Sequence, residues 1–138
     1  MTALNFKRNW SNGKSTLFKE LILNGKKPHT IRPVRIHPIK AGMLLQLYQG
    51  LRTRNCELIT ELPCIMVRPI AIYLPHEISP IGNIVLDGRD LPTPSMDNLI
   101  INDGFTTRED FFDFFEYMYD ENQRIGYLRL IQWAETPY

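Results

Sequence analysis

The chain has 138 residues, of which 43% are apolar and 22% are charged, the composition of one ordinary globular domain. No apolar run approaches the roughly 20 residues that a membrane helix needs, and the N-terminal residues MTALNFKRNW lack the apolar segment of a secretory signal. Two cysteines, Cys56 and Cys64, are too few for a disulfide framework. We therefore expect a single cytoplasmic domain over residues 1–138 that is neither secreted nor inserted in a membrane.

The net charge of +1 conceals an uneven distribution along the chain. Residues 1–54 carry eleven Lys or Arg and one acid, Glu20, for a formal charge of +10, whereas residues 55–138 carry five Lys or Arg and fourteen acids, for −9. This asymmetry favours a basic surface for an anionic partner such as nucleic acid. The alternative is that the two halves neutralise each other within one domain.

Hydrophobic periodicity and turn residues predict mixed α and β structure. In chain order, strands are expected at 5–10, 43–48, 56–60, 65–74, 78–86 and 125–133, and helices at 15–23, 95–102 and about 107–119. Three prolines exclude a helix from 26–38 and favour extended backbone there. Asp87-Gly88 indicates a turn in a loop over 87–94, and Thr106 and Glu109 have the spacing of a capping box. The order predicts an α+β fold, a small, mostly antiparallel sheet or barrel decorated by two or three helices.

Other groups of chemically notable residues indicate structural roles. No zinc site is expected, since the spacing typical of zinc ligands is absent among His29, His37 and His76. We expect no metal and no organic cofactor. The apolar surroundings of Cys56 and Cys64 predict buried structural thiols, and the phenylalanine-rich stretch 111–115 predicts a helix face packed in the core.

The segment Gly25-Lys26-Lys27-Pro28-His29-Thr30-Ile31-Arg32 carries the chemistry. It reads G-x-K-x-x-T-x-R, and in an extended backbone Thr30 and Arg32 point the same way. A partly desolvated lysine among other cations has a lowered pKa and can act as a base, so Lys27 is placed to take a proton from Thr30 while Arg32 holds an anion or a carbonyl oxygen. We expect residues 25–32 to line the largest polar cleft. The alternative is a solvated basic loop.

This loop resembles the signature of the ASCH family, whose fold is a PUA-like β-barrel. The resemblance extends over residues 6–133 and is closest to small bacterial or phage members. It rests on further short motifs in the same order: Lys40-Ala41-Gly42 before a strand, the segment 50–56, Asp103-Gly104-Phe105 before the phenylalanine-rich helix, and Ile131-Gln132-Trp133.

The resemblance implies binding of RNA or of a modified nucleoside in a cleft lined by the G-x-K-x-x-T-x-R loop. The residues expected to bind the substrate or RNA are Gly25, Lys26, Arg32, Arg35, Arg52 and Arg54. Aromatic side chains that are candidates for stacking on a base, but are expected in the core, are Trp10, Tyr48 and Trp133.

The alternative function is enzymatic, because one bacterial branch of the family consists of acetylcytidine amidohydrolases. In that branch the motif lysine, the motif threonine and a later glutamate are catalytic. Lys27 and Thr30 match the first two, and Asp103 stands nearest to the third. The resemblance thus implies Thr30 as nucleophile, Lys27 as base and Asp103 as acid. A nuclease is a third possibility and is disfavoured, because no histidine pair supplies a general acid and base.

Overall fold

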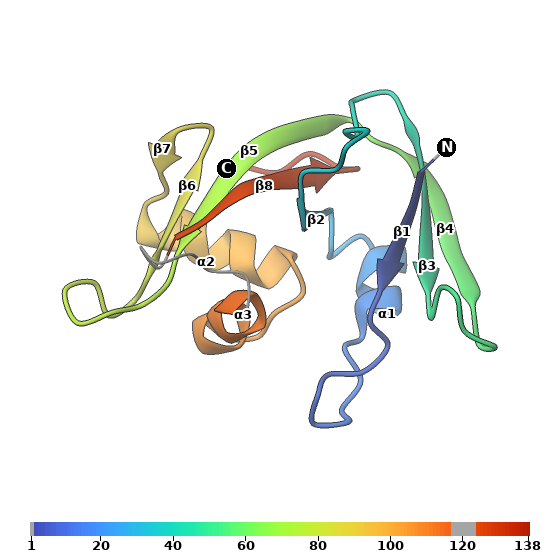
Figure 1. Ribbon diagram of the computed structural model, residues 1–138, viewed down its shortest axis with the longest axis horizontal. Coiled ribbons are helices and arrows are strands. Elements are labelled where there is room, and N and C mark those ends of the chain that lie inside the picture. The colour runs from blue at the N-terminus through green and yellow to red at the C-terminus, as the bar shows by residue number, and fades with distance from the viewer. Residues whose placement is uncertain (1, 117–123) are drawn as a thin grey trace.

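The computed structural model describes residues 2–116 and 124–138 and has an α+β fold with mostly antiparallel strands (Figure 1). The strands are β1 (Thr2–Phe6), β2 (His29–Pro33), β3 (Leu44–Gln49), β4 (Glu57–Pro63), β5 (Met66–Tyr73), β6 (Asn83–Leu86), β7 (Arg89–Asp90) and β8 (Arg124–Gln132). The helices are α1 (Phe18–Leu23), α2 (Thr93–Asn102) and α3 (Arg108–Phe115). The prediction of an α+β fold with mostly antiparallel strands and two or three helices is therefore confirmed.

The described strands form two sheets rather than a closed barrel. One sheet has the order β1-β3-β4, in which β1 and β3 run parallel, and the other has the order β2-β8-β5-β6-β7, in which every neighbouring pair is antiparallel. Only Cys64 and Ile65 separate β4 from β5, so the chain passes between the sheets at this corner (Figure 1). The corner is held because Cys64 N–H donates to Met43 O at 2.8 Å and Ile65 N–H donates to Gln132 O at 2.9 Å.

Each sheet has its own hydrophobic core. α2 and α3 cover the larger sheet and bury their apolar faces against it, including the phenylalanine-rich stretch at Phe111, Phe112 and Phe115. The six-residue helix α1 buries Phe18 and Ile22 against the smaller sheet. Burial of this apolar surface is the main favourable term in the folding of both halves.

Most predicted elements are present, with shifted boundaries. The helix predicted over 15–23 begins only at Phe18. The hydroxyl of Thr16 donates to Lys7 O and accepts from Phe18 N–H. Leu17, between them, has a left-handed backbone with a φ of +59°. Side-chain hydrogen bonds of this kind compete with the first helical turn. The strand predicted over 78–86 is confined to β6.

The predicted loop over 87–94 contains β7 and the first residues of α2. The Asp87-Gly88 turn is confirmed as the link between β6 and β7, with both residues at positive φ, as a type I′ hairpin turn requires. The capping box at Thr106 is wrong, because Thr107 is the N-cap and accepts from Asp110 N–H at 3.1 Å. Residues 117–119 of the predicted last helix lie outside the described residues.

Two further predictions concern the burial of the cysteines and the absence of a membrane-spanning helix. Cys64 is buried as predicted, whereas the expectation for Cys56 is wrong, because it is exposed in the turn before β4. None of the helices in 2–116 and 124–138 has the length and apolar character needed to cross a bilayer.

Candidate functional site

A cavity of about 270 Å³ lies at the seam between the two cores. Phe6 and Phe18 of the smaller core face it from one side, and Phe105 and Phe115 of the larger core face it from the other. We call this cavity the Lys27 pocket, and it is lined by Asn5, Phe6, Lys7, Phe18, Lys27, Thr30, Ile31, Arg32, Pro33, Asp103, Phe105, Phe114 and Phe115. It therefore unites the motif residues Lys27, Thr30 and Arg32 with Asp103, which is more than seventy positions away in the chain.

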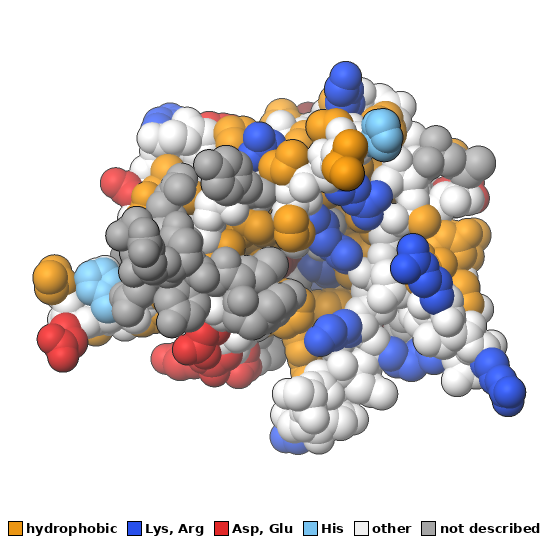
Figure 2. Space-filling model, viewed as in Figure 1, with side chains coloured by type: hydrophobic (Ala, Val, Ile, Leu, Met, Phe, Trp, Pro, Cys, Tyr) orange, Lys and Arg blue, Asp and Glu red, His pale blue; other side chains and the backbone are white. Residues whose placement is uncertain are grey.

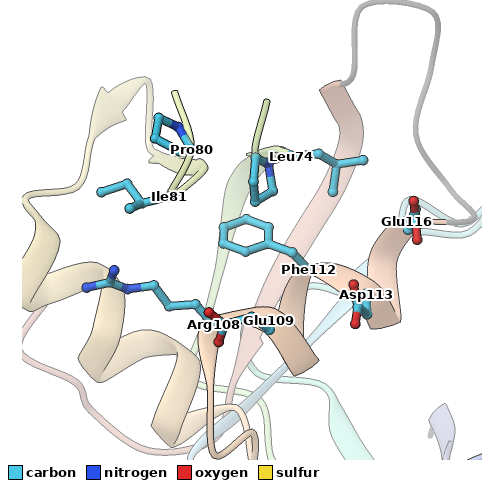
Figure 3. Close-up of a pocket in the computed structure, with 9 residues that line it drawn as sticks. Leu74, Pro80, Ile81, Arg108, Glu109, Phe112, Asp113 and Glu116 are labelled. Carbon is cyan, nitrogen blue, oxygen red and sulfur yellow. The ribbon is translucent and has the colours of Figure 1, made fainter. Parts of the chain in front are cut away.

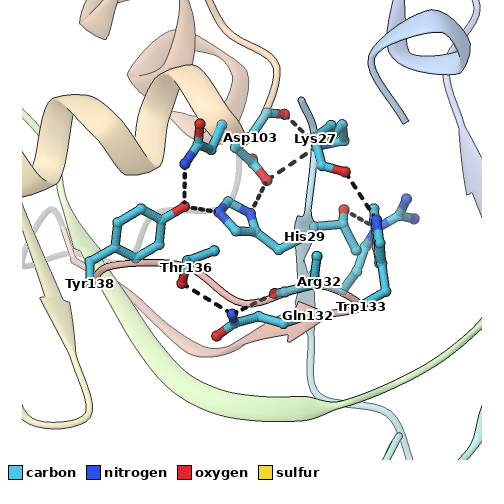
Figure 4. A network of polar contacts seen from close by, with 11 residues as sticks. Lys27, His29, Arg32, Asp103, Gln132, Trp133, Thr136 and Tyr138 are labelled. Carbon is cyan, nitrogen blue, oxygen red and sulfur yellow. Dashed lines mark hydrogen bonds and ion pairs between the residues drawn. The ribbon is translucent and has the colours of Figure 1, made fainter. Parts of the chain in front are cut away.

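The backbone of Lys27 is fixed on both sides, which directs its side chain inward. Its N–H donates to Leu21 O at 2.9 Å, and its carbonyl accepts from the indole N–H of Trp133 at 3.0 Å. The side chain is only 2% exposed, and its Nζ lies 4.8 Å from the centre of the Phe18 ring. Lys27 Nζ is 3.2 Å from Asp103 Oδ1 and also donates to the backbone oxygen of Asp103 (Figure 4).

Lys27 and Asp103 form a buried ion pair, and opposing effects act on the pKa of Lys27. Burial lowers the pKa of the Lys27 ammonium, the charge and hydrogen bond of Asp103 act in the opposite direction, and the Arg32 charge lowers it further. Desolvation is the largest of these effects, so the pKa of Lys27 is below its ordinary value. A lysine with a lowered pKa loses its proton at a lower pH than a surface lysine does.

Asp103 and the two residues after it each have a distinct role. Asp103 ends α2, where its N–H donates to Leu99 O at 2.9 Å and its side chain turns toward Lys27. Gly104 has a φ of +102°, and a Cβ there would lie 2.6 Å from Cε1 of Phe18. Phe105 then forms part of the pocket wall. The motif thus supplies the carboxylate that pairs with Lys27, a glycine where the backbone passes against the Phe18 ring, and an aromatic ring in the pocket wall.

Thr30 and Arg32 project from β2 to the same side, as their spacing predicts. Thr30 is 5% exposed, and its Oγ1 accepts from Arg32 Nε at 3.1 Å. Arg32 also donates to the backbone oxygen of Asn5 at 2.6 Å and lies 4.8 Å from the centre of the Phe6 ring. Within the described residues, Lys27 Nζ hydrogen-bonds to Asp103 and not to Thr30.

The remaining predicted binding residues lie outside the cavity. These residues are exposed on loops or turns: Gly25, Lys26, Arg35, Arg52 and Arg54. The 50–55 turn adjoins the pocket edge, since Leu51 N–H donates to Asn5 Oδ1 at 2.8 Å. Figure 2 shows Lys and Arg side chains gathered on the side of β1, α1 and β3, with acidic side chains gathered below α3. On this face the charge asymmetry of the sequence is also an asymmetry in space.

The sequence did not identify several residues of this site. Asn5, Lys7 and the wall residues Phe6 and Phe18 come from segments that no motif marks, whereas Phe105, Phe114 and Phe115 belong to motifs of the resemblance. The sequence indicates no functional role for His29, since a zinc site is not expected, yet its Nδ1 lies 3.1 Å from Asp103 Oδ1 and its Nε2 hydrogen-bonds to Tyr138 Oη. Neither Trp10 nor Trp133 lines the cavity among the described residues. Trp10 packs against Phe105 at 5.4 Å, and Trp133 packs against Phe6 at 6.1 Å between ring centres.

The expectation that residues 25–32 line the largest polar cleft is wrong. A larger cavity, of about 410 Å³, lies between α3 and the β5–β6 loop (Figure 3). Leu74, Ile81 and Phe112 give it an apolar lining, and Glu109 and Asp113 of α3 give it an acidic rim. The Lys27 pocket is smaller, and phenylalanine rings from both cores line it.

In comparisons with known proteins, no protein family, curated protein or solved structure matches this chain.

The buried histidine generates a prediction about stability and pH. Burial lowers the pKa of His29 below its ordinary value of 6.5, so below about pH 6.5 the unfolded chain binds a proton that the folded chain does not. The free energy of unfolding should therefore fall as the pH drops through this range, by up to about 1.4 kcal/mol per pH unit. Urea unfolding at pH 7.5, 6.5 and 5.5 measures this slope.

His29→Gln, which cannot titrate here, should flatten the slope, whereas His37→Gln, at an exposed position, should leave it unchanged. An equal slope in the wild type and in His29→Gln would contradict a neutral buried His29.

Proposed function

We propose that the chain is an ASCH-like domain of PUA-like fold that binds RNA or a modified nucleoside in the Lys27 pocket. The observation that carries this proposal is the convergence of Lys27, Thr30, Arg32 and Asp103 on one aromatic-walled cavity. The sharp corner at Cys64 and Ile65, which brings the two sheets together, supports the fold assignment.

The size and walls of the pocket suit a small planar ligand. Its volume of about 270 Å³ lies just below the roughly 300–1,000 Å³ of sites that take drug-sized ligands. The half-buried ring of Phe114, together with Phe6 and Phe105, gives the pocket aromatic walls against which a base can pack. A nucleoside or one flipped-out nucleotide of RNA fits these constraints.

The polar groups suit the carbonyl and amide edge of a base. A protonated Lys27 has three N–H bonds, and two are directed to the backbone and side-chain oxygens of Asp103. The third remains for a ligand oxygen. Lys7, exposed at the mouth, adds a positive charge for a phosphate, and the flanking basic residues extend this surface for a longer strand.

The test is binding of cytidine, acetylcytidine and a short single-stranded RNA, measured by calorimetry. Lys27→Met should weaken binding of all three by roughly 10- to 100-fold, because hydrogen bonds to charged groups contribute about 1.5–3 kcal/mol. Phe114→Ala, which removes a half-buried wall, should weaken binding as well, and RNA affinity alone should fall steeply with salt.

Lys40→Met is the matched control, since Lys40 is exposed and outside the pocket. Binding that is equal in the wild type and in folded Lys27→Met, or absent for every ligand, would contradict the proposal.

The second candidate function is hydrolysis of an acylated cytidine, and the environment of Thr30 favours it. Its buried hydroxyl accepts a hydrogen bond from Arg32 in the same cavity as Lys27. Neutral Lys27 would take the hydroxyl proton as Oγ1 attacks the acetyl carbon. The C–N bond then breaks and Lys27 returns the proton to the leaving amine. Water would hydrolyse the acetyl-threonine ester to acetate. Asp103 accepts hydrogen bonds from Lys27 and His29, which suits it to position the base rather than to donate a proton.

Thr30→Val separates the two functions, because it removes the hydroxyl and keeps the shape. If the chain is a hydrolase, this variant should release no cytidine from acetylcytidine, as read by chromatography, while still binding it. The wild-type rate should rise with pH as Lys27 loses its proton. Turnover that persists in Thr30→Val would exclude the threonine mechanism, and binding without turnover in the wild type would leave the binding function alone.

A further inference from the structure

His29 lies behind the Lys27 pocket, completely buried, with both ring nitrogens hydrogen-bonded. Nδ1 is 3.1 Å from Asp103 Oδ1, the same oxygen that accepts from Lys27. Nε2 hydrogen-bonds to Tyr138 Oη, and the two rings meet edge to face at 5.7 Å between their centres. Figure 4 shows the resulting continuous path of polar contacts from Tyr138 through His29 to Asp103 and Lys27.

The hydrogen bonds along this path have one consistent direction. The Asp103 carboxylate can only accept, so the proton of a neutral His29 resides on Nδ1 and Nε2 is an acceptor. Tyr138 must then donate its hydroxyl proton to Nε2, and Asn102 Nδ2 donates to Tyr138 Oη at 3.2 Å. Burial supports this state because it raises the pKa of the Tyr138 hydroxyl and lowers the pKa of His29.

The segment 134–138 is held in place by the sheet that it crosses. Gln132 Nε2 donates to Ala134 O at 3.2 Å and to Thr136 Oγ1 at 3.1 Å. Arg68 of β5 donates to the backbone oxygen of Tyr138 and pairs with Asp87 at 2.8 Å. The position of the Tyr138 hydroxyl is therefore set by contacts to β5 and β8, independently of His29.

We propose that Tyr138 is a positioning residue for the Lys27 pocket: by donating to Nε2 it keeps His29 neutral, and through His29 it maintains the orientation of Asp103. The consequence for a ligand rests on the proposed function, whereas the protonation state of His29 does not. Without the Tyr138 hydroxyl, Nε2 loses its donor and becomes free to take a proton. A protonated His29 then competes with Lys27 for Asp103 Oδ1 and repels the Lys27 charge.

The charged and titratable groups that face His29 are Asp103, Lys27 and Tyr138. Of these, only Tyr138 contacts Nε2 among the described residues. Tyr138→Phe therefore changes a single hydrogen bond of His29 and retains the edge-to-face ring contact.

The experiment is a nitrogen-15 NMR titration of the histidine side chains from pH 5 to pH 8 in the wild type and in Tyr138→Phe. Wild-type His29 should hold its proton on Nδ1 at neutral pH and resist protonation below pH 6.5. In Tyr138→Phe its pKa should shift upward, with the signals of exposed His37 as an internal reference.

A second readout uses cytidine as the probe. The affinity of Tyr138→Phe should fall between pH 8 and pH 6, whereas that of the wild type should not. An unchanged pKa of His29 in Tyr138→Phe, or a wild type that is protonated on Nε2 at neutral pH, would overturn the inference whatever binds. A wild type that binds no cytidine but shows the expected NMR behaviour would contradict the proposed function and leave the positioning role intact.

Discussion

The buried ion pair of Lys27 and Asp103 is the constraint around which the site is organised. Isolated charges are costly in a protein interior, so each partner requires the other. Lys27 follows the helix of the smaller core and Asp103 ends a helix of the larger core. Their contact therefore joins the two halves of the molecule at the point where a cavity remains between the phenylalanine rings.

Other features of the fold serve to bring these two side chains together. Trp133 holds the carbonyl of Lys27, and the positive φ of Gly104 lets the chain after Asp103 pass against the Phe18 ring. His29 supplies a second donor to the carboxylate, on the side away from the pocket. As a result, Lys27 is directed at the cavity and its partner Asp103 is held in place by His29. This arrangement is suited to recognising a ligand oxygen or to transferring a proton.

The sequence predicted the local parts of this arrangement well and the long-range parts poorly. The positions of strands and helices follow from periodicity and from Pro and Gly, and short motifs indicate the importance of residues 27–32 and of Asp103. The contact of His29 with Tyr138 joins positions that no spacing rule relates. The division into two sheets depends on the corner at Cys64 and Ile65. The sequence predicts two consecutive strands there, and nothing in it shows that they belong to different sheets. The larger cavity by α3 arises from how Phe112 packs under the β5–β6 loop, which composition does not reveal.

A double-mutant cycle on the free energy of unfolding tests the central ion pair most directly. Lys27→Met leaves a buried carboxylate unpaired, and Asp103→Asn leaves a buried ammonium unpaired while keeping an acceptor for His29. Each single change should cost about 3–5 kcal/mol, whereas the double variant, which buries neither charge, should cost at least about 2 kcal/mol less than their sum. Costs that add to within about 0.5 kcal/mol would show that the two side chains do not stabilise each other, and would contradict a site organised around this ion pair.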